Sequence, residues 1–271
     1  MAPEARALLI DMDGVLYQGE QALPGACEAL DWLAVNRIPH LFVTNTTSRP
    51  RAALIEKLGR LKMPMDAGQI LTPPVAAARW LRAHVKGRVA LFVPDATRIE
   101  FECLEIADLS TTLPVAAVVI GDYGEHWTFA ALNQAFRWLM QEPKPVLIAL
   151  GMTRYWRAED GLRLDTAPFV AALEHATGQQ AVVLGKPAAP FFEAALGQLG
   201  ASASETLMIG DDIRADIDGA QKLGIRGLLV RTGKFRPEDL SRDIHPAAVL
   251  DSFAALPQWW RQHARPVREK R

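Results

Sequence analysis

The chain has 271 residues, of which 49% are hydrophobic and 23% are charged. This balance is typical of a globular protein that buries a sizeable core in one large or two moderate domains. The formal net charge of −1 excludes a field over the whole molecule that would recruit nucleic acid or an anionic membrane. The basic stretch 261–271 is interpreted as a solvated tail, so we expect no nucleic-acid partner.

The cysteines and the hydropathy pattern bear on the cellular compartment. Cys27 and Cys103 lie far apart and in no metal-ligand pattern, which argues against a disulfide framework and favours a reducing cytoplasm. The N-terminus reaches acidic residues before any long apolar region, unlike a secretory signal. No apolar run approaches the roughly 18 residues typical of a membrane-spanning helix. We therefore expect a cytoplasmic protein without a membrane partner.

Short apolar runs alternate with longer amphipathic segments along the chain. Buried strands are predicted at 7–10, 41–43, 89–93, 115–120, 146–150, 181–184, 206–209 and 227–230. Helices are predicted at 25–35, 50–60, 74–85, 128–141, 190–199 and 213–223. This alternation predicts an α/β fold with Rossmann-like parallel sheets covered by helices.

Polar residues that can take part in catalysis or ligand binding follow four of these strands, at 7–10, 41–43, 181–184 and 206–209. The carboxyl ends of neighbouring parallel strands meet at one crevice, so we expect these residues to converge. The stretch between the second and third of these strands supplies none of them, although it has strands and helices of its own. We therefore predict a catalytic core of residues 1–75 and 181–271, with an inserted α/β cap domain of residues 76–180.

Two carboxylates, Asp11 and Asp13, follow the first strand, and Gly14 allows the backbone to turn away sharply. A carboxylate at a strand end is costly without a cation or a helix cap unless it binds a ligand. One carboxylate can face a metal while the other faces a leaving group. The alternative is a plain turn or a calcium loop, but Val15–Tyr17 lacks the regularly spaced oxygen ligands of a calcium loop.

Thr44 and Asn45 follow the second strand and precede a predicted helix. A hydroxyl, an amide and free backbone N–H groups can hold phosphoryl oxygens, although such residues are also ordinary helix caps. Lys186 lies between the third strand and a helix, where an ammonium can neutralise both a carboxylate and a phosphoryl group. Most lysines are simply solvated, so each of these two segments is weak when taken alone.

Four carboxylates, Asp211, Asp212, Asp216 and Asp218, lie within eight residues after the fourth strand. Acidic residues favour a helix N-terminus, which accounts for one or two of them. Four carboxylates this close repel one another, and a bound divalent cation relieves the repulsion. Oxygen ligands suit Mg²⁺, so the sequence predicts a magnesium site here.

The four segments resemble the motifs of the haloacid dehalogenase superfamily in three respects: their order along the chain, their placement at strand ends and their residue types. Phosphatases of that superfamily have DxDG, then Ser or Thr, then Lys, then an acidic GDD cluster. The resemblance spans residues from about 7 to 235. The stretches TNTTSR, GKPAAPFF and MIGDDIRADIDGAQKLGIRGLLVRTGKFRP are similar to subfamily IIA, the branch with a large cap between the second and third motifs, which includes p-nitrophenylphosphatase-like enzymes.

The resemblance implies a Mg²⁺-dependent phosphatase that acts on a small phosphorylated substrate through an aspartyl-phosphate. It implies that Asp11 is the nucleophile and Asp13 the general acid and base. It implies that Thr44, Asn45 and Lys186 bind the substrate phosphate. It implies that Mg²⁺ is bound by the side chains of Asp11 and Asp211 and by the carbonyl of Asp13. Asp212 and Asp216 are implied to orient waters and Lys186. Asp13 itself favours phosphatase or phosphomutase chemistry. A phosphotransferase, a phosphomutase and a non-catalytic binding protein remain the alternatives on this core.

Within the predicted cap, Arg154, Tyr155 and Trp156 follow a strand and are candidates for substrate specificity. Aromatic faces and cations there can contact a phosphorylated ligand. The equal alternative is a β-hairpin that turns at Glu159–Gly161 and packs against its own domain. Apolar strands of the cap also offer a surface for a homodimer.

Overall fold

The structure is a computed structural model that describes residues 5–158 and 160–263. The chain folds into two compact units. Unit 1 is drawn from Met1–Thr44, Ala52–Leu71 and Lys186–Arg271, and unit 2 from Asn45–Arg51 and Thr72–Gly185. The predicted solvated tail falls largely on 264–271 and so lies outside the described residues.

The mixed α/β fold with parallel sheets is confirmed. Each of the eight runs predicted as strands forms one: β1 Ala7–Asp11, β4 His40–Val43, β6 Val89–Phe92, β7 Ala117–Ile120, β8 Val146–Ala149, β11 Val182–Val183, β12 Thr206–Gly210 and β13 Arg226–Val230. Apart from residues at their ends, such as His40, Thr206 and Arg226, these strands are mainly apolar, as expected for strands that are covered on both faces.

The core of unit 1 is a parallel sheet with the strand order β14-β13-β12-β1-β4-β5, in which β5 is Ile70–Leu71 and β14 is Ala248–Leu250. β1 lies in the interior of this sheet and pairs with β12 on one side and β4 on the other. Every residue of β1 and β12 is buried. A small antiparallel hairpin, β2 Tyr17–Gln18 with β3 Gln21–Ala22, follows β1.

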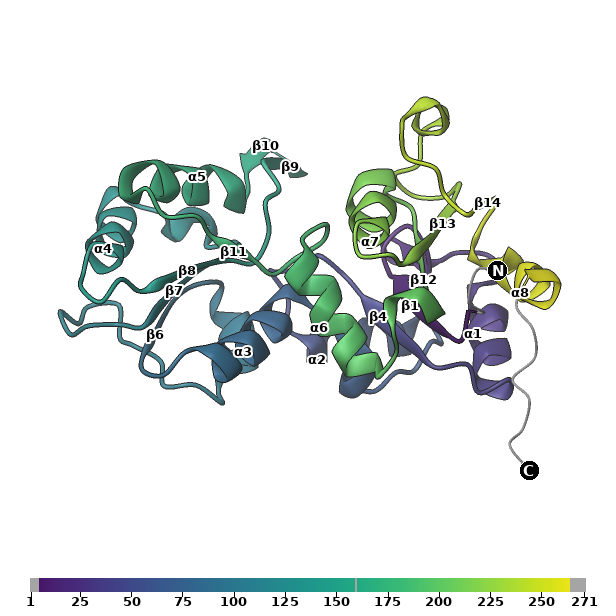
Figure 1. The fold of residues 1–271 in the computed structure, drawn as a ribbon, viewed down its shortest axis with the longest axis horizontal. Coiled ribbons are helices and arrows are strands. Elements are labelled where there is room, and N and C mark those ends of the chain that lie inside the picture. The colour runs from purple at the N-terminus through teal and green to yellow at the C-terminus, as the bar shows by residue number, and fades with distance from the viewer. Residues whose placement is uncertain (1–4, 159, 264–271) are drawn as a thin grey trace. The chain divides into compact units, whose positions relative to one another are not determined.

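Helices cover both faces of this sheet (Figure 1). α1 Ala26–Val35, α2 Arg51–Arg60 and α8 Leu256–His263 contribute to the core beneath one face, where the α1 residue Leu33 packs with Ile10 and Phe42 of the strands. α6 Ala189–Leu199 contacts β4, and α7 Gly219–Gln221 contacts both β13 and α6. Although both faces are covered, the buried carboxylates Asp11 and Asp211 stand at the ends of β1 and β12.

Unit 2 has its own parallel sheet with the order β11-β8-β7-β6. α4 Phe129–Leu139 and α5 Thr166–Thr177 pack on one face, where Trp138 and Val170 join Phe92 and Leu147 in a second core. Figure 1 shows α3 Pro73–His84 on the other face of this sheet. An antiparallel hairpin joins β9 Tyr155–Ala158 to β10 Gly161–Leu164.

Short helical turns complete the described structure. These are η1 Ala67–Gln69, η2 Asp95–Phe101, η3 Gly124–His126, η4 Ala203–Glu205, η6 Pro237–Ser241, η7 Phe253–Ala255 and the π-helical turn η5 Ile213–Asp218. The helical segment predicted over 213–223 is present over 213–221, where the π-helical turn η5 is followed by the three residues of α7. Helix α5 and strands β5 and β14 are further elements that the sequence pattern did not separate.

One strand belongs to a different sheet from the one expected. The run 181–184 was assigned to the core sheet, but β11 pairs with β8 in unit 2 through Val182↔Ile148 and Val183↔Ala149. A buried parallel strand has the same apolar pattern in either sheet, so the pattern alone does not choose its partner. The edge position beside β4 in unit 1 is taken by the two-residue strand β5.

The homodimer expected from the apolar strands of the cap stays a prediction. The side chains of β6 and β7 are buried within unit 2 itself. Among residues 5–158 and 160–263, no helix has the length and apolar character needed to cross a membrane.

Candidate active site

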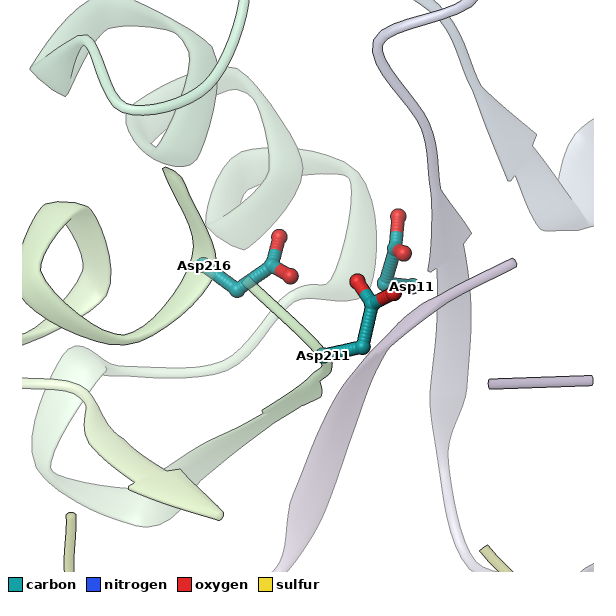
Figure 2. Close-up of side chains that lie close together, drawn as sticks. All are labelled: Asp11, Asp211 and Asp216. Carbon is teal, nitrogen blue, oxygen red and sulfur yellow. The ribbon is translucent and has the colours of Figure 1, made fainter. Parts of the chain in front are cut away.

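Three buried carboxylates meet at the carboxyl edge of the unit 1 sheet. Asp11 is the last residue of β1, Asp211 directly follows β12, and Asp216 comes from η5. Ligand oxygens of the three side chains lie within 4.8 Å of one another, and Figure 2 shows the side chains gathered there. The predicted convergence of the first and fourth segments is therefore present in the structure.

Lys186 connects two of these carboxylates. Its Nζ donates to Asp11 Oδ1 at 2.5 Å and to Asp216 Oδ1 at 2.6 Å, and all three side chains are buried. Burial alone would lower the pKa of this ammonium, but the charges of Asp11 and Asp216 raise it above its ordinary value. Lys186 therefore stays protonated and holds the position of Asp11.

Asp211 has two oxygens with different surroundings. Oδ2 accepts a hydrogen bond from the backbone N–H of Lys234 at 2.7 Å. Oδ1 is buried and has no hydrogen-bond partner in the described part of the chain. Burial, with the nearby charge of Asp11, raises the pKa of the Asp211 carboxyl from 3.8 to about 7. When Asp211 is ionised, its Oδ1 therefore carries charge that no hydrogen bond from the described residues stabilises.

Asp216 and Asp212 are each held by several hydrogen bonds. Asp216 uses both oxygens, one toward Lys186 and the other toward the backbone N–H of Asp212 at 3.1 Å. Asp212 Oδ1 accepts from the N–H groups of Arg214 at 3.0 Å and Ala215 at 2.9 Å, so it caps η5. The π-helical turn thus returns Asp216 to the strand end.

The residues present fit a hard divalent cation. The donor set at the cluster consists of carboxylate oxygens, which suit Mg²⁺. Asp211 Oδ1 in the same cluster accepts no hydrogen bond from any residue within 5–158 or 160–263. A buried acceptor without a partner is costly, and a cation at this point would satisfy it.

Asp13 differs from the three clustered carboxylates in its exposure to solvent. Its residue is exposed, whereas Asp11 and Gly14 on either side of it in the motif are buried. Gly14 has φ +81°, and a Cβ there would collide with Asp211 Oδ2 and come within 2.9 Å of the Gly233 Cα. The turn that follows Asp13 therefore requires glycine at position 14.

Thr44 and Asn45 come directly after β4. Thr44 is buried, and its backbone N–H donates to the carbonyl of Leu71 at 3.2 Å, which continues the ladder to β5. Asn45 belongs to unit 2, where its Oδ1 lies close to Gly185. Thr44 and Lys186 lie in unit 1 with the carboxylates.

The hairpin alternative for the candidate specificity residues is present in unit 2. Tyr155 pairs with Leu164 and Trp156 pairs with Arg163 across the two strands. Tyr155 is 58% exposed and Trp156 is 42% exposed, so much of each side chain remains open to solvent and is not packed against the rest of unit 2. Arg154 is also exposed.

A fifth segment, Thr232–Lys234, also reaches the site, and sequence reasoning missed it. Besides the bond from the Lys234 N–H to Asp211, Thr232 Oγ1 donates to the carbonyl of Gly14 at 2.5 Å. Lys234 Nζ lies 3.6 Å from Asp212 Oδ2. The sequence did contain one indication of this segment. Thr232–Lys234 comes shortly after the predicted strand 227–230, and residues that follow parallel strands lie at the same edge of the sheet as the other site residues.

Family models match both ends of the chain. The model described as Haloacid dehalogenase-like hydrolase matches residues 8–107, and one described as HAD-hydrolase-like matches residues 183–256. The two matches contain all of the carboxylates and the lysine of the site.

Similar proteins include named phosphatases. The chain is 40% identical over 257 residues to phospholysine phosphohistidine inorganic pyrophosphate phosphatase of Bos taurus, which covers 92% of this chain and 90% of that protein. It is 42% identical over 245 residues to haloacid dehalogenase-like hydrolase domain-containing protein 2 of Bos taurus, covering 90% and 91%. The solved structure of p-nitrophenyl phosphatase from Archaeoglobus fulgidus superposes with a TM-score of 0.85 at 26% identity, over 95% of this chain and 100% of that one.

Proposed function

Because this chain belongs to the haloacid dehalogenase-like hydrolases and is an enzyme of the phosphatase class, we propose that it is a Mg²⁺-dependent phosphatase that hydrolyses a small phosphorylated substrate through an aspartyl-phosphate. The observation that supports this most strongly is the cluster at the carboxyl edge of unit 1. There Lys186 holds Asp11 beside Asp211, whose Oδ1 is buried without a hydrogen-bond partner in the described part of the chain.

We assign the direct Mg²⁺ ligands to the side chains of Asp11 and Asp211 and to the backbone carbonyl of Asp13. The hydrogen bonds distinguish Asp211 from Asp216, because both oxygens of Asp216 are already engaged whereas Asp211 Oδ1 is not. Asp212 and Asp216 accordingly orient Lys186 and the surrounding waters. When bound, the cation offsets the repulsion between a carboxylate and a phosphate dianion.

Asp11 is the proposed nucleophile. One of its carboxylate oxygens forms a bond to phosphorus while the bond from phosphorus to the leaving oxygen breaks. Asp13, which is exposed, donates a proton to that leaving oxygen. In the second step Asp13 accepts a proton from water, the water oxygen bonds to phosphorus, and the bond to Asp11 breaks. The products are inorganic phosphate and the leaving group, which is an alcohol from a phosphoester, an amine from a phosphoamide and a second phosphate from pyrophosphate.

Thr44, Asn45 and Lys186 are proposed to hold the phosphoryl oxygens. Lys186 is protonated and immobile, which suits it to charge that develops on a phosphoryl group. The hydroxyl of Thr44 and the amide of Asn45 add neutral donors. These groups contact only the phosphoryl part, which every substrate shares.

We propose that unit 2, which includes the whole of the predicted cap 76–180, acts as the cap that selects substrates. Its exposed Tyr155 and Trp156, with Arg154, are the proposed contacts for the leaving group. Relatives are named for phospholysine, phosphohistidine, pyrophosphate and p-nitrophenyl phosphate, so we propose a small phosphoester, phosphoamide or phosphoanhydride as substrate. A reducing cytoplasm is the proposed location, because Cys27 and Cys103 are both free thiols.

The test is release of inorganic phosphate from a panel of small phosphorylated compounds. We expect Mg²⁺ to be required, EDTA to abolish release, and added Mg²⁺ to restore it. Asp11→Asn should remove turnover, whereas the matched control Asp31→Asn, an exposed carboxylate of α1, should behave as the wild type. Full activity in metal-free buffer, or turnover by Asp11→Asn, would contradict the mechanism. Transfer of phosphate to a second substrate would favour the phosphotransferase alternative.

A further inference from the structure

The turn Thr232–Phe235 connects two loops of the site that are far apart in sequence. It follows β13, and its ends are joined by a hydrogen bond from the N–H of Phe235 to the carbonyl of Thr232 at 3.3 Å. β13 pairs in parallel with β12, so the segments after these two strands emerge at the same edge of the sheet. The turn therefore lies next to Asp211.

The turn contacts Asp211 and the Asp11–Gly14 loop at the same time. On one side the Lys234 N–H donates to Asp211 Oδ2, and on the other Thr232 Oγ1 donates to the Gly14 carbonyl. Gly233 lies between them with φ +61°, and a Cβ there would collide with Asp211 Oδ2 and approach the Gly14 Cα to 2.7 Å. The turn is therefore bonded to both loops and packs closely between them at Gly233.

The two contacts act on different parts of the proposed cation site. The bond to Oδ2 fixes the rotation of the Asp211 carboxylate, and this leaves Oδ1 directed into the cluster without a hydrogen-bond partner among the described residues. The bond from Thr232 restrains the backbone of Gly14. Gly14 directly follows Asp13, and the backbone carbonyl of Asp13 is a proposed Mg²⁺ ligand. A ligand whose orientation is set in advance loses less freedom when a metal binds.

We propose that the turn Thr232–Phe235, with Thr232 as its anchoring side chain, is a positioning element that sets the Mg²⁺ affinity of this enzyme. The inference rests on the proposed function, because it requires the cation to bind at Asp11, Asp13 and Asp211. Thr232 does not touch substrate or metal in this assignment; it acts through the Gly14 carbonyl and the turn. Removing its hydroxyl loosens both proposed ligand loops.

The experiment measures Mg²⁺ binding directly, by isothermal titration calorimetry on the full chain without substrate. Thr232→Val keeps the shape and removes the donor, and we expect Mg²⁺ to bind about tenfold more weakly, since the loss of such orienting partners typically costs 10–100-fold. Thr232→Ser keeps the hydroxyl and should restore most of the affinity.

The matched control is Thr206→Val at the other end of β12. Thr206 is buried, and its hydroxyl donates to the Ser202 carbonyl at 2.8 Å, so its loss removes the same kind of bond. We expect a lower melting temperature in EDTA for Thr206→Val, with unchanged Mg²⁺ affinity. A general loss of stability would weaken Mg²⁺ binding in both valine variants and would overturn the inference.

The proposed cation site is tested separately in the same titrations by Asp211→Asn. If the wild type binds Mg²⁺ and Asp211→Asn does not, the site stands, and wild-type affinity in Thr232→Val then refutes the positioning role alone. If the wild type and Asp211→Asn bind Mg²⁺ alike, the proposed site itself is wrong and the inference fails with it.

Discussion

Replacing Asp211 with asparagine should stabilise the metal-free protein while it removes the response to Mg²⁺. In the metal-free state the ionised carboxylate is buried beside Asp11 with Oδ1 unpartnered by any described residue, and its pKa is raised from 3.8 to about 7. An asparagine oxygen can still accept the hydrogen bond from the Lys234 N–H. Its NH₂ group can then face the remaining carboxylates as a donor.

The size and pH dependence of this effect follow from the pKa of Asp211 in the folded and unfolded protein. A tenfold difference between the two acid dissociation constants is worth about 1.4 kcal/mol, so the ionised Asp211 destabilises the folded metal-free protein by about 4 kcal/mol at pH 8. Because the folded pKa lies above the unfolded one, the penalty is absent below pH 3.8, grows as pH rises toward 7, and is constant above that. At pH 5 it falls to about 2 kcal/mol. Burial of the amide offsets part of the gain, so we expect a net stabilisation of about 2–3 kcal/mol at pH 8.

The assay is urea unfolding at pH 8 and pH 5, in EDTA and in Mg²⁺. Asp212→Asn is the matched control, because Asp212 caps η5 through two backbone N–H groups and gains nothing by losing its charge. Asp212→Asn should be neutral or destabilising by up to about 1 kcal/mol in EDTA. Mg²⁺ should stabilise the wild type by mass action and leave Asp211→Asn unaffected. The reasoning is refuted if Asp211→Asn is less stable than the wild type in EDTA at pH 8.

Four further predictions concern catalysis and selectivity. Asp13→Asn should slow turnover by about 10²–10⁴-fold, with a smaller penalty on p-nitrophenyl phosphate than on poor leaving groups; an equal penalty would argue against proton transfer. Lys186→Met should abolish activity and lower the free energy of unfolding by about 3–5 kcal/mol, because two buried carboxylates lose their cation; a stable, active variant would contradict this. Tyr155→Ala should lower kcat/KM a few-fold to about tenfold for bulky organic phosphates and little for pyrophosphate, while uniform loss with a lower melting temperature would indicate a structural role. Ca²⁺ should inhibit in competition with Mg²⁺, since its coordination is looser; activation by Ca²⁺ would refute the ligand assignment.

Most of the fold was predictable from sequence because its strands are buried on both faces. Continuous apolar runs such as 7–10 and 206–209 have few other interpretations when helices alternate with them. The short strands β5 and β14 were missed because two or three residues do not establish a pattern. Strand β11 was assigned to the wrong sheet, since pairing partners depend on long-range contacts that an apolar run does not encode.

The sequence by itself determined the chemistry of the site, through residue types and their positions. Carboxylates after β1 and after β12, with a lysine before α6, indicate convergence at one sheet edge because parallel strands present their carboxyl ends together. Only the tertiary structure decided which oxygens are engaged and which are not. Lys186 occupies one oxygen each of Asp11 and Asp216, while Asp211 Oδ1 has no partner in the part of the chain that the structure describes. It also brought Thr232 and Lys234 to the site, because strand order and turn geometry place groups that are distant in sequence within hydrogen-bonding distance of one another.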